Sequence, residues 1–209
     1  MSYHGGFLGA GLASLAYSRR RGLSWLAWAD VMALCAPLGY TLGRLGNFLN
    51  GELWGKVSDR PWAMVFPGAT PFSAREPWVQ EFANKVGISV SSMNDMVNLP
   101  RHPTQLYEAL LEGLVLWAVL WLFVRRRPSF PGFALACYTL GYGLARFGLE
   151  YLRGSEAYVL RLGPVQAQPD FFAGLGYLST GQVLSLAMVL GAGAFLFFAS
   201  RSSRRSTAL

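Results

Sequence analysis

The chain has 209 residues, of which 53% are hydrophobic and 14% are charged, and its mean hydropathy is +0.31. Ordinary soluble domains carry about 25% charged residues, so this composition excludes disorder and a soluble globular domain and predicts an all-α polytopic membrane protein. The net charge of +7 would suggest nucleic-acid binding in a soluble protein, but here the basic residues must first be assigned to the two sides of a membrane.

Five segments are apolar enough to cross a bilayer, which requires about 20 largely apolar residues. They cover residues 2–18, 23–49, 103–124, 131–152 and 178–200, and we interpret them as one membrane domain. The first segment is short, but three arginines follow its apolar run instead of preceding it, which indicates a span and not a cleaved signal peptide. Residues 51–102 contain five prolines and several aromatic residues, and we expect them to form a small cap on the outer side of the membrane.

The basic residues predict the orientation of these spans. One side receives nine arginines in short clusters at residues 19–21, 125–127 and 201–205, whereas the other receives seven Lys and Arg spread over two longer loops. Short loops rich in Lys and Arg stay in the cytoplasm, so the amino terminus is predicted outside and the carboxyl terminus inside. The basic excess is then a topology signal, and we expect no nucleic-acid partner.

The sequence offers no cofactor chemistry of its own. Cys35 and Cys137 both lie in apolar runs, which excludes a disulfide framework and a thiolate metal site, and we predict neither a metal nor a cofactor. The sequence also contains no G-x-S-x-G nucleophile, H-E-x-x-H zinc pair or phosphate-binding loop. Any reaction would therefore join two reactants that both come from outside the protein.

Polar residues gather in the outer third of the membrane, and they come from four spans. Because polar groups are costly in hydrocarbon, those that remain usually face a protein interior or a wet cavity, so this level predicts a cavity that opens outward. Its members are His4 at the start of the first span, Arg44, Asn47, Asn50 and Glu52 at the close of the second, His102, Gln105, Tyr107, Glu108 and Glu112 at the opening of the third, and Arg146, Glu150 and Arg153 at the close of the fourth.

Helical spacing relates some of these charges to one another. Glu108 and Glu112 are four residues apart on one helix face, which is unfavourable unless cations such as Arg44 and Arg146 lie opposite them. An arginine fork also suits a phosphate or a carboxylate, so the residues alone predict a cavity for an anionic ligand. We expect Asn47 and Glu52 to orient Arg44, and Glu150 to orient Arg146.

Simpler interpretations stand beside this one. Arg44 and Arg146 could simply extend from their helix ends to place their charges at the membrane interface, and Glu112 could be a structural ion-pair partner. From its position alone, His4 is a frayed terminal residue, and His102 caps the helix that follows it.

Several longer motifs resemble one known family. The runs are YHGG at residues 3–6, GRLGNFLNGELWG at 43–55, PRHPTQLYE at 100–108, Arg146-x-x-x-Glu150-x-x-Arg153, and STGQVLS at 179–185. Together they resemble the bacterial prolipoprotein diacylglyceryl transferases over essentially the whole chain. The family has about seven spans, and this chain begins where the third of them would, without the family's His-Trp-Tyr-Gly-like motif.

The resemblance implies a reaction in the bacterial cytoplasmic membrane. The diacylglyceryl group of phosphatidylglycerol is attached to the lipobox cysteine in the signal peptide of a prolipoprotein, and glycerol phosphate leaves. It also implies catalytic roles for His4, as a base toward the thiol, and for Arg146 and Glu150. The residues expected to bind substrate are Arg44, Asn47, Asn50, Glu52, His102, Tyr107, Glu108 and Arg153.

Two other classes of protein remain open from the sequence. The first is a truncated, inactive relative that binds membrane lipid or serves as a scaffold. The second is a small transporter for an anionic substrate, which should show repeated halves or broken helices near the midplane, and the sequence indicates neither.

Overall fold

The computed structural model describes residues 3–127, 130–153, 158–161 and 177–207, and it gives only the backbone for residues 3–5, 7, 158–161, 177 and 203–207. Most of this part is helical, as predicted. The long elements are α1 (Tyr3–Arg20), α2 (Trp25–Leu49), a continuous helical segment from Thr104 to Val124, α6 (Phe133–Leu149) and α7 (Thr180–Thr207).

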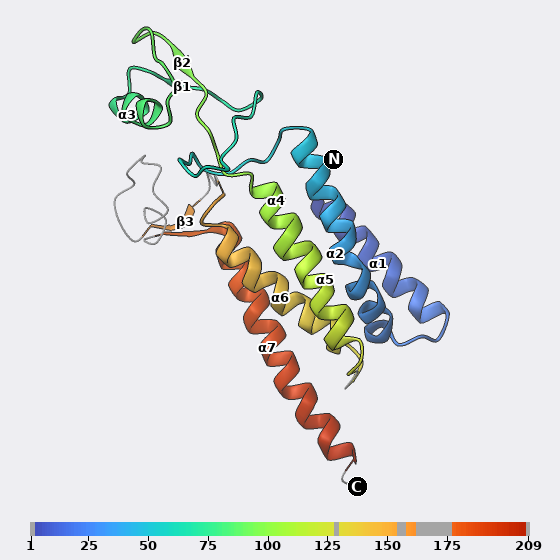
Figure 1. The fold of residues 1–209 in the computed structure, drawn as a ribbon. Helices are drawn as coiled ribbons and strands as arrows, with labels where there is room; N and C mark the ends of the chain where they lie inside the picture. Colours follow the sequence, from blue (N-terminus) through green and yellow to red (C-terminus); the bar gives the residue numbers. More distant parts are fainter. Residues whose placement is uncertain (1–2, 128–129, 154–157, 162–176, 208–209) are drawn as a thin grey trace.

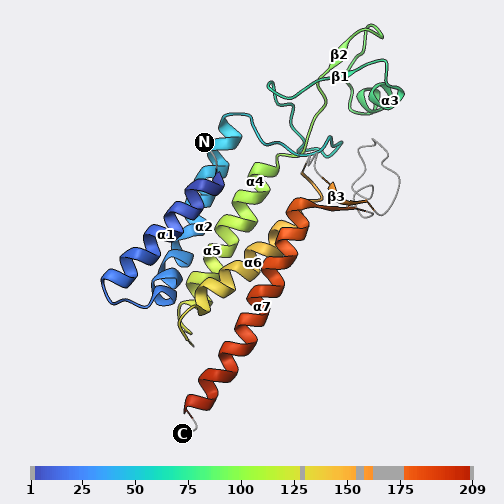
Figure 2. The ribbon, with the colours of Figure 1, turned by 180° about the vertical axis from the view of Figure 1, so that it is seen from behind.

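The helices form one bundle with a small unit at one end (Figures 1 and 2). Helix α1 packs on α2, α2 packs on the 104–124 segment and on α6, and α6 packs along α7. Helix α1 begins at the end of the bundle that carries the small unit, and α7 ends at the opposite one (Figure 1).

Three helices of the described chain are long and apolar enough to cross a membrane: Trp25–Leu49, Thr104–Val124 and Thr180–Ser202. Helices α1 and α6 occupy the first and fourth predicted spans and have 18 and 17 residues. The chain is therefore a membrane protein with several apolar helices, and the count of five spans stays a prediction.

The segment from Thr104 to Val124 is not a regular α-helix. It consists of α4 (Thr104–Glu108), the π-helical η1 (Ala109–Val115), α5 (Leu116–Val119) and the π-helical η2 (Leu120–Val124). Such wide turns are rare and occur frequently at functional sites. Gly113 lies in η1 at the crossing with α2, where an added Cβ would come 2.0 Å from Thr41 Oγ1, so only glycine permits this close approach.

Asp30 of α2 anchors the beginning of α6. Its Oδ2 and Oδ1 accept hydrogen bonds of 2.8 Å from the backbone N–H groups of Gly132 and Leu135. These N–H groups have no partner within their own helix, so the carboxylate of a different helix completes the cap. Asp30 thereby fixes the helix that carries Arg146 and Glu150 at its far end.

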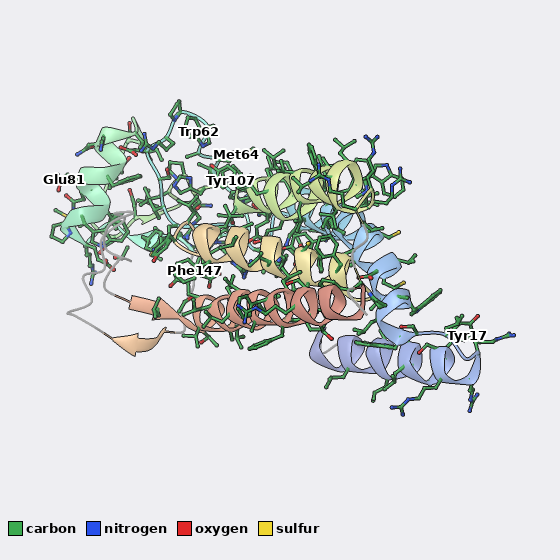
Figure 3. All side chains as sticks on the ribbon, turned by 90° about the horizontal axis from the view of Figure 1, so that it is seen from below. Tyr17, Trp62, Met64, Glu81, Tyr107 and Phe147 are labelled. Atoms are coloured by element: carbon green, nitrogen blue, oxygen red, sulfur yellow. The ribbon has the colours of Figure 1, made fainter. Side chains whose placement is uncertain are left out.

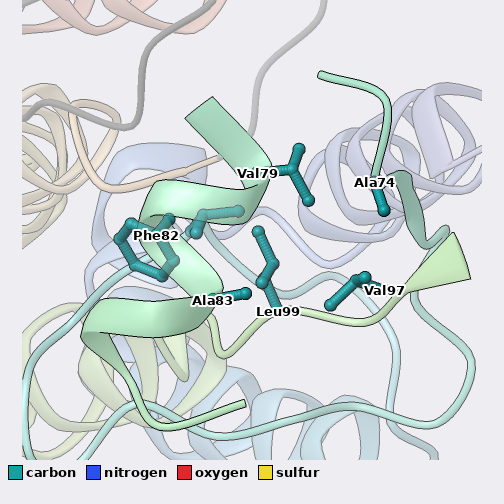
Figure 4. Packing of buried hydrophobic residues seen from close by; sticks show 7 residues of the cluster. Ala74, Val79, Phe82, Ala83, Val97 and Leu99 are labelled. Atoms are coloured by element: carbon teal, nitrogen blue, oxygen red, sulfur yellow. The ribbon is translucent and has the colours of Figure 1, made fainter. Parts of the chain in front are cut away.

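Residues 51–102 fold into the small unit, which we call the cap. It contains α3 (Pro77–Lys85) and the antiparallel pair β1 (Phe72–Ser73) and β2 (Met96–Val97), so the expectation of an all-α chain is incomplete here. A second antiparallel pair joins β3 (Tyr158–Arg161) to β4 (Tyr177–Ser179). The cap has its own apolar core, of which Figure 4 shows Val57, Ala74, Val79, Phe82, Ala83, Val97 and Leu99.

Backbone hydrogen bonds tie the cap to the end of the bundle. Gly55 N–H donates to His102 O, and Lys56 N–H donates to Leu152 O, each at 2.9 Å. A Cβ on Gly55 would come 2.5 Å from Leu152 O and 2.6 Å from Thr104 Cγ2, so the absence of a side chain permits this junction. The ends of α2, α4 and α6 consequently meet beneath the cap.

Candidate functional site

Glu108 is the centre of an ion-pair cluster at the cap end of the bundle. Its side chain is 1% exposed, and three arginines surround it. Arg44 Nε lies 2.7 Å from Glu108 Oε2, Arg146 Nη1 lies 3.1 Å from Oε1, and Arg153 Nε lies 3.6 Å from Oε1. A buried carboxylate needs such compensation because removing it from water is costly.

Tyr40 and Glu112 extend this cluster toward the middle of the membrane. The Tyr40 hydroxyl donates a short hydrogen bond to Glu112 Oε2 and accepts one of 2.9 Å from Arg44 Nε. The guanidinium carbon of Arg44 also lies 4.9 Å from the centre of the Tyr40 ring. Because Arg44 N–H is directed at the tyrosine, its contact with Glu108 Oε2 is ionic, and that oxygen accepts no hydrogen bond from the described residues.

Arg44 and Arg146 differ in how their forks are used. Both terminal nitrogens of Arg146 contact carboxylates. Its Nη1 lies 3.1 Å from Glu108 Oε1 and 3.9 Å from Glu112 Oε1, and its Nη2 lies 3.2 Å from Glu150 Oε2. Arg44 is held through Nε, and within the described part of the chain its two terminal nitrogens donate no hydrogen bond. The terminal edge of Arg44 therefore remains available to an anion, whereas Arg146 holds three carboxylates together.

Glu150 links the end of α6 to the beginning of α7. Its Oε1 accepts a 3.0 Å hydrogen bond from Ser179 Oγ, and Ser179 and Gln182 exchange backbone and side-chain hydrogen bonds in a capping box. A Cβ on Gly181 would come 2.7 Å from Glu150 Oε1, so a glycine here makes room for the carboxyl group. Arg153 Nη1 lies 4.0 Å from Glu150 Oε2 on the other side.

The predicted partners of Arg44 form a separate polar group at the end of α2. Asn47 Nδ2 donates to Glu52 Oε1 at 2.8 Å, and Asn50 Nδ2 donates to the same oxygen at 3.5 Å. The expectation that Asn47 and Glu52 orient Arg44 is therefore wrong, because Tyr40 and Glu108 hold its guanidinium. The chain turns back at Gly51, whose φ is +65°, and this turn brings Glu52 against Asn47.

Two further predicted residues meet above the cluster, where α4 begins. His102 Nδ1 lies 3.2 Å from the Tyr107 hydroxyl, which accepts a 2.7 Å hydrogen bond from the indole N–H of Trp62. Since the tyrosine oxygen accepts from the indole, its own proton is available to Nδ1 of a neutral His102. Trp62, Tyr107 and the neighbouring Met64 lie together at this end of the molecule in Figure 3.

The structure thus brings Arg44, Glu108, Arg146, Glu150 and Arg153 into one cluster and leaves His102 and Tyr107 in another. His4 lies in the first turn of α1, and its side chain is outside the described residues. Sequence analysis missed Tyr40 and Ser179 as members of the cluster. Tyr40 had one available signal, because it precedes Arg44 by four residues and so lies on the same helix face. Within the described residues no His, Cys, Asp or Glu group is arranged for a metal ion.

The fold and this cluster define a membrane protein with a buried arginine–carboxylate site. The family model described as "Prolipoprotein diacylglyceryl transferase" matches residues 1–198, so the chain belongs to this family. A phosphatidylglycerol–prolipoprotein diacylglyceryl transferase of Treponema pallidum (strain Nichols) is 45% identical over 212 residues, which cover 99% of this chain and 64% of the relative.

A transferase of the same name from Paraburkholderia phymatum is 44% identical over 216 residues, which cover 100% of this chain and 65% of the relative. A third, from Treponema denticola, is 45% identical over 197 residues and is covered to 58% of its length. The chain therefore spans about three fifths of the length of these curated relatives.

The surroundings of His102 predict how stability changes with pH. Burial and the nearby charge of Arg60 lower the pKa of His102 below its ordinary value, while Asp59 opposes the shift. The unfolded chain therefore binds a proton at about pH 6.5, whereas the folded protein does not until the pH is lower, so stability falls as the pH falls through this window.

We expect the melting temperature in detergent to decrease from pH 7.5 to 5.5, and His102→Gln to remove part of this decrease. One such group contributes a slope of at most about 1.4 kcal/mol per pH unit. Carboxylates titrate equally in both proteins, so the difference between the two curves isolates His102. Identical pH slopes for the two proteins would contradict the assignment.

Proposed function

We propose that this protein transfers the diacylglyceryl group of phosphatidylglycerol to the lipobox cysteine thiol of a prolipoprotein signal peptide. The single observation that carries this proposal is the state of Arg44. Its Nε is fixed by Tyr40 and Glu108, and its terminal nitrogens donate no hydrogen bond to the described residues. Membership of the family and the names of the relatives supply the identity of the two substrates.

The reaction places its charge where an arginine can act. The cysteine thiolate attacks the glyceryl carbon that bears the phosphate ester, a C–S bond forms, and the C–O bond breaks. The phosphate oxygen takes the electron pair, so negative charge grows on glycerol phosphate as it leaves. Two coplanar N–H groups of Arg44 can donate to that phosphate in the transition state.

The carboxylates keep this arginine in place without adding net charge to the site. Glu108, Glu112 and Glu150 face Arg44, Arg146 and Arg153, so three negative groups oppose three positive ones. A bound phosphate then adds an anion to a neutral cluster, and it meets the least occupied guanidinium, that of Arg44. A proton must also leave the thiol, and we assign this role to His4 on the family resemblance.

Lysine at position 44 distinguishes a phosphate fork from a charge at the interface. We expect Arg44→Lys to lower transfer about a hundredfold, equivalent to roughly 3 kcal/mol of transition-state stabilisation, because Lys cannot present two coplanar donors. Thioether formation on a lipobox peptide in phosphatidylglycerol vesicles can be followed by mass spectrometry at matched protein levels.

Arg75 of the cap supplies the matched control, since it is exposed and donates to Asn94 Oδ1 at 2.7 Å, away from the cluster. Arg75→Lys should transfer normally. Near-normal transfer by Arg44→Lys would reduce Arg44 to an interfacial charge. If the unsubstituted chain binds phosphatidylglycerol but forms no thioether, the lipid-binding scaffold becomes the better assignment.

The Tyr40 hydroxyl offers a second test, because Tyr40→Phe removes both hydrogen bonds and keeps the ring beneath Arg44. We expect a loss of about tenfold in transfer, the usual effect of one hydrogen bond to a charged group. If Tyr40 acts by positioning Arg44, the same substitution should cost little more in the Arg44→Lys background, which a double-mutant cycle measures. Additive losses would place the effect of Tyr40 elsewhere.

We propose further that the protein lies in the bacterial cytoplasmic membrane with its amino terminus, cap and polar cluster on the outer side. The three arginine clusters on alternate connections support this orientation. A reporter that is active only outside the cytoplasm should therefore work when inserted in the exposed segment 91–94 of the cap and be silent after Arg127. The reverse pattern would contradict the orientation and the outward-facing site.

A further inference from the structure

The cap exposes a short apolar segment beside the bundle. Trp62, Met64 and Val65 are 56%, 41% and 51% exposed, although they lie within four residues of one another in the chain. Phe66, by contrast, is 3% exposed and stacks on Trp54. Three large apolar groups exposed within four residues are costly to keep in water, and we call Trp62, Met64 and Val65 the apolar loop.

Hydrogen bonds hold the apolar loop in one conformation. Ala63 N–H closes a turn by donating to Arg60 O at 2.8 Å, and Met64 exchanges backbone hydrogen bonds of 3.0 and 2.9 Å with Arg101. The indole N–H of Trp62 is satisfied by the Tyr107 hydroxyl. What the loop still presents to its surroundings is therefore mainly apolar surface on a fixed frame.

Tyr107 gives the depth of this loop relative to the membrane. It is the fourth residue of the apolar segment Thr104–Val124, so its Cα lies about 5 Å along the axis from the first residue. The Trp62 side chain is hydrogen-bonded to Tyr107 and so lies at the level where a span leaves the hydrocarbon. Trp and Tyr residues concentrate at this level in membrane proteins. Figure 3 shows Trp62 and Met64 next to Tyr107 at this end of the bundle.

The apolar loop also continues a surface that faces lipid. Beyond Tyr107, Leu110, Leu111 and Leu114 of η1 are 51%, 41% and 46% exposed. Exposed leucines on an apolar helix of this length are the groups that contact acyl chains. Trp62 is hydrogen-bonded to Tyr107, which comes just before these exposed leucines in the chain.

We propose that Trp62, Met64 and Val65 insert into the headgroup–acyl boundary of the phospholipid bilayer and hold the cap against the membrane. The exposed Arg60 beside them is suited to contact lipid phosphates, as basic residues flanking interfacial aromatic groups do. The proposal concerns lipid contact alone, so it stands or falls independently of diacylglyceryl transfer.

The cap contains its own control for this contact. Met96 of β2 is 61% exposed, and β2 lies at the part of the cap that is far from the bundle in Figures 1 and 2. Met64 and Met96 are therefore the same residue type, both exposed, on two parts of one folded unit. Only the first is expected to meet lipid.

The experiment compares single labelled cysteines in the Cys35→Ala, Cys137→Ala background. Met64→Cys, Val65→Cys and Met96→Cys are each labelled with bimane and reconstituted in phosphatidylethanolamine–phosphatidylglycerol vesicles. Quenching is measured with phospholipids brominated near the start of the acyl chain and, separately, with aqueous iodide. All three side chains are exposed, so the substitutions should leave folding intact, which a thermal melt of each labelled protein checks.

We expect brominated lipid to quench the probes at positions 64 and 65 at least threefold more than the probe at 96, and iodide to show the opposite order. Stronger quenching of positions 64 and 65 by iodide than by lipid would overturn the proposal. Equal quenching of positions 64 and 96 by lipid would also overturn it, because the whole cap would then lie on the membrane.

Discussion

The packing of the bundle depends on a single buried carboxylate, that of Glu108. It is 1% exposed and faces arginines from α2, from α6 and from the residues just after α6. Removing one partner from a buried ion pair is strongly destabilising, by about 3–5 kcal/mol, because the remaining charge is left without compensation. The helices therefore have to meet in one arrangement. Glycine at positions 113 and 181 permits the close approaches that this arrangement requires.

The same network divides its arginines between support and binding. Arg146 joins Glu108, Glu112 and Glu150, which come from two helices, and Glu150 passes the connection to the capping box of α7. Arg44 makes its hydrogen bond and its shortest ion-pair contact through Nε. A site that must recognise a phosphate inside a membrane faces a conflict, since an arginine without partners is costly and one with every nitrogen occupied is unable to bind. Holding Arg44 by one edge resolves this conflict.

Much of this arrangement follows from the sequence, and the exceptions have identifiable causes. Apolar length placed the helices, and the spacing of Glu108 and Glu112 required cations such as Arg44 and Arg146 opposite them, which the structure has. Asn47 and Glu52 were expected to orient Arg44 but instead bind each other, because the turn at Gly51 brings Glu52 against Asn47. Tyr40 was missed because its spacing of four residues from Arg44 places it on the same helix face but does not distinguish packing from hydrogen bonding. The short strands of the cap arise from contacts distant in sequence, which local patterns do not carry.

Sharing the arginines among separate helices also constrains how the chain enters the membrane during synthesis. When α2 emerges, Glu108 has not yet been made, and an arginine at the centre of a lone span costs about 2.5–3.5 kcal/mol, with less near its end. When α4 and η1 follow, Arg44 gains its counter-charge, but Glu112 still lacks Arg146, which arrives with α6 together with Glu150. Each new helix thus neutralises a charge left by an earlier one. Insertion of this protein is expected to proceed as a series of paired steps, in which α2 remains beside the translocation machinery until α4 arrives and the pair is completed by α6.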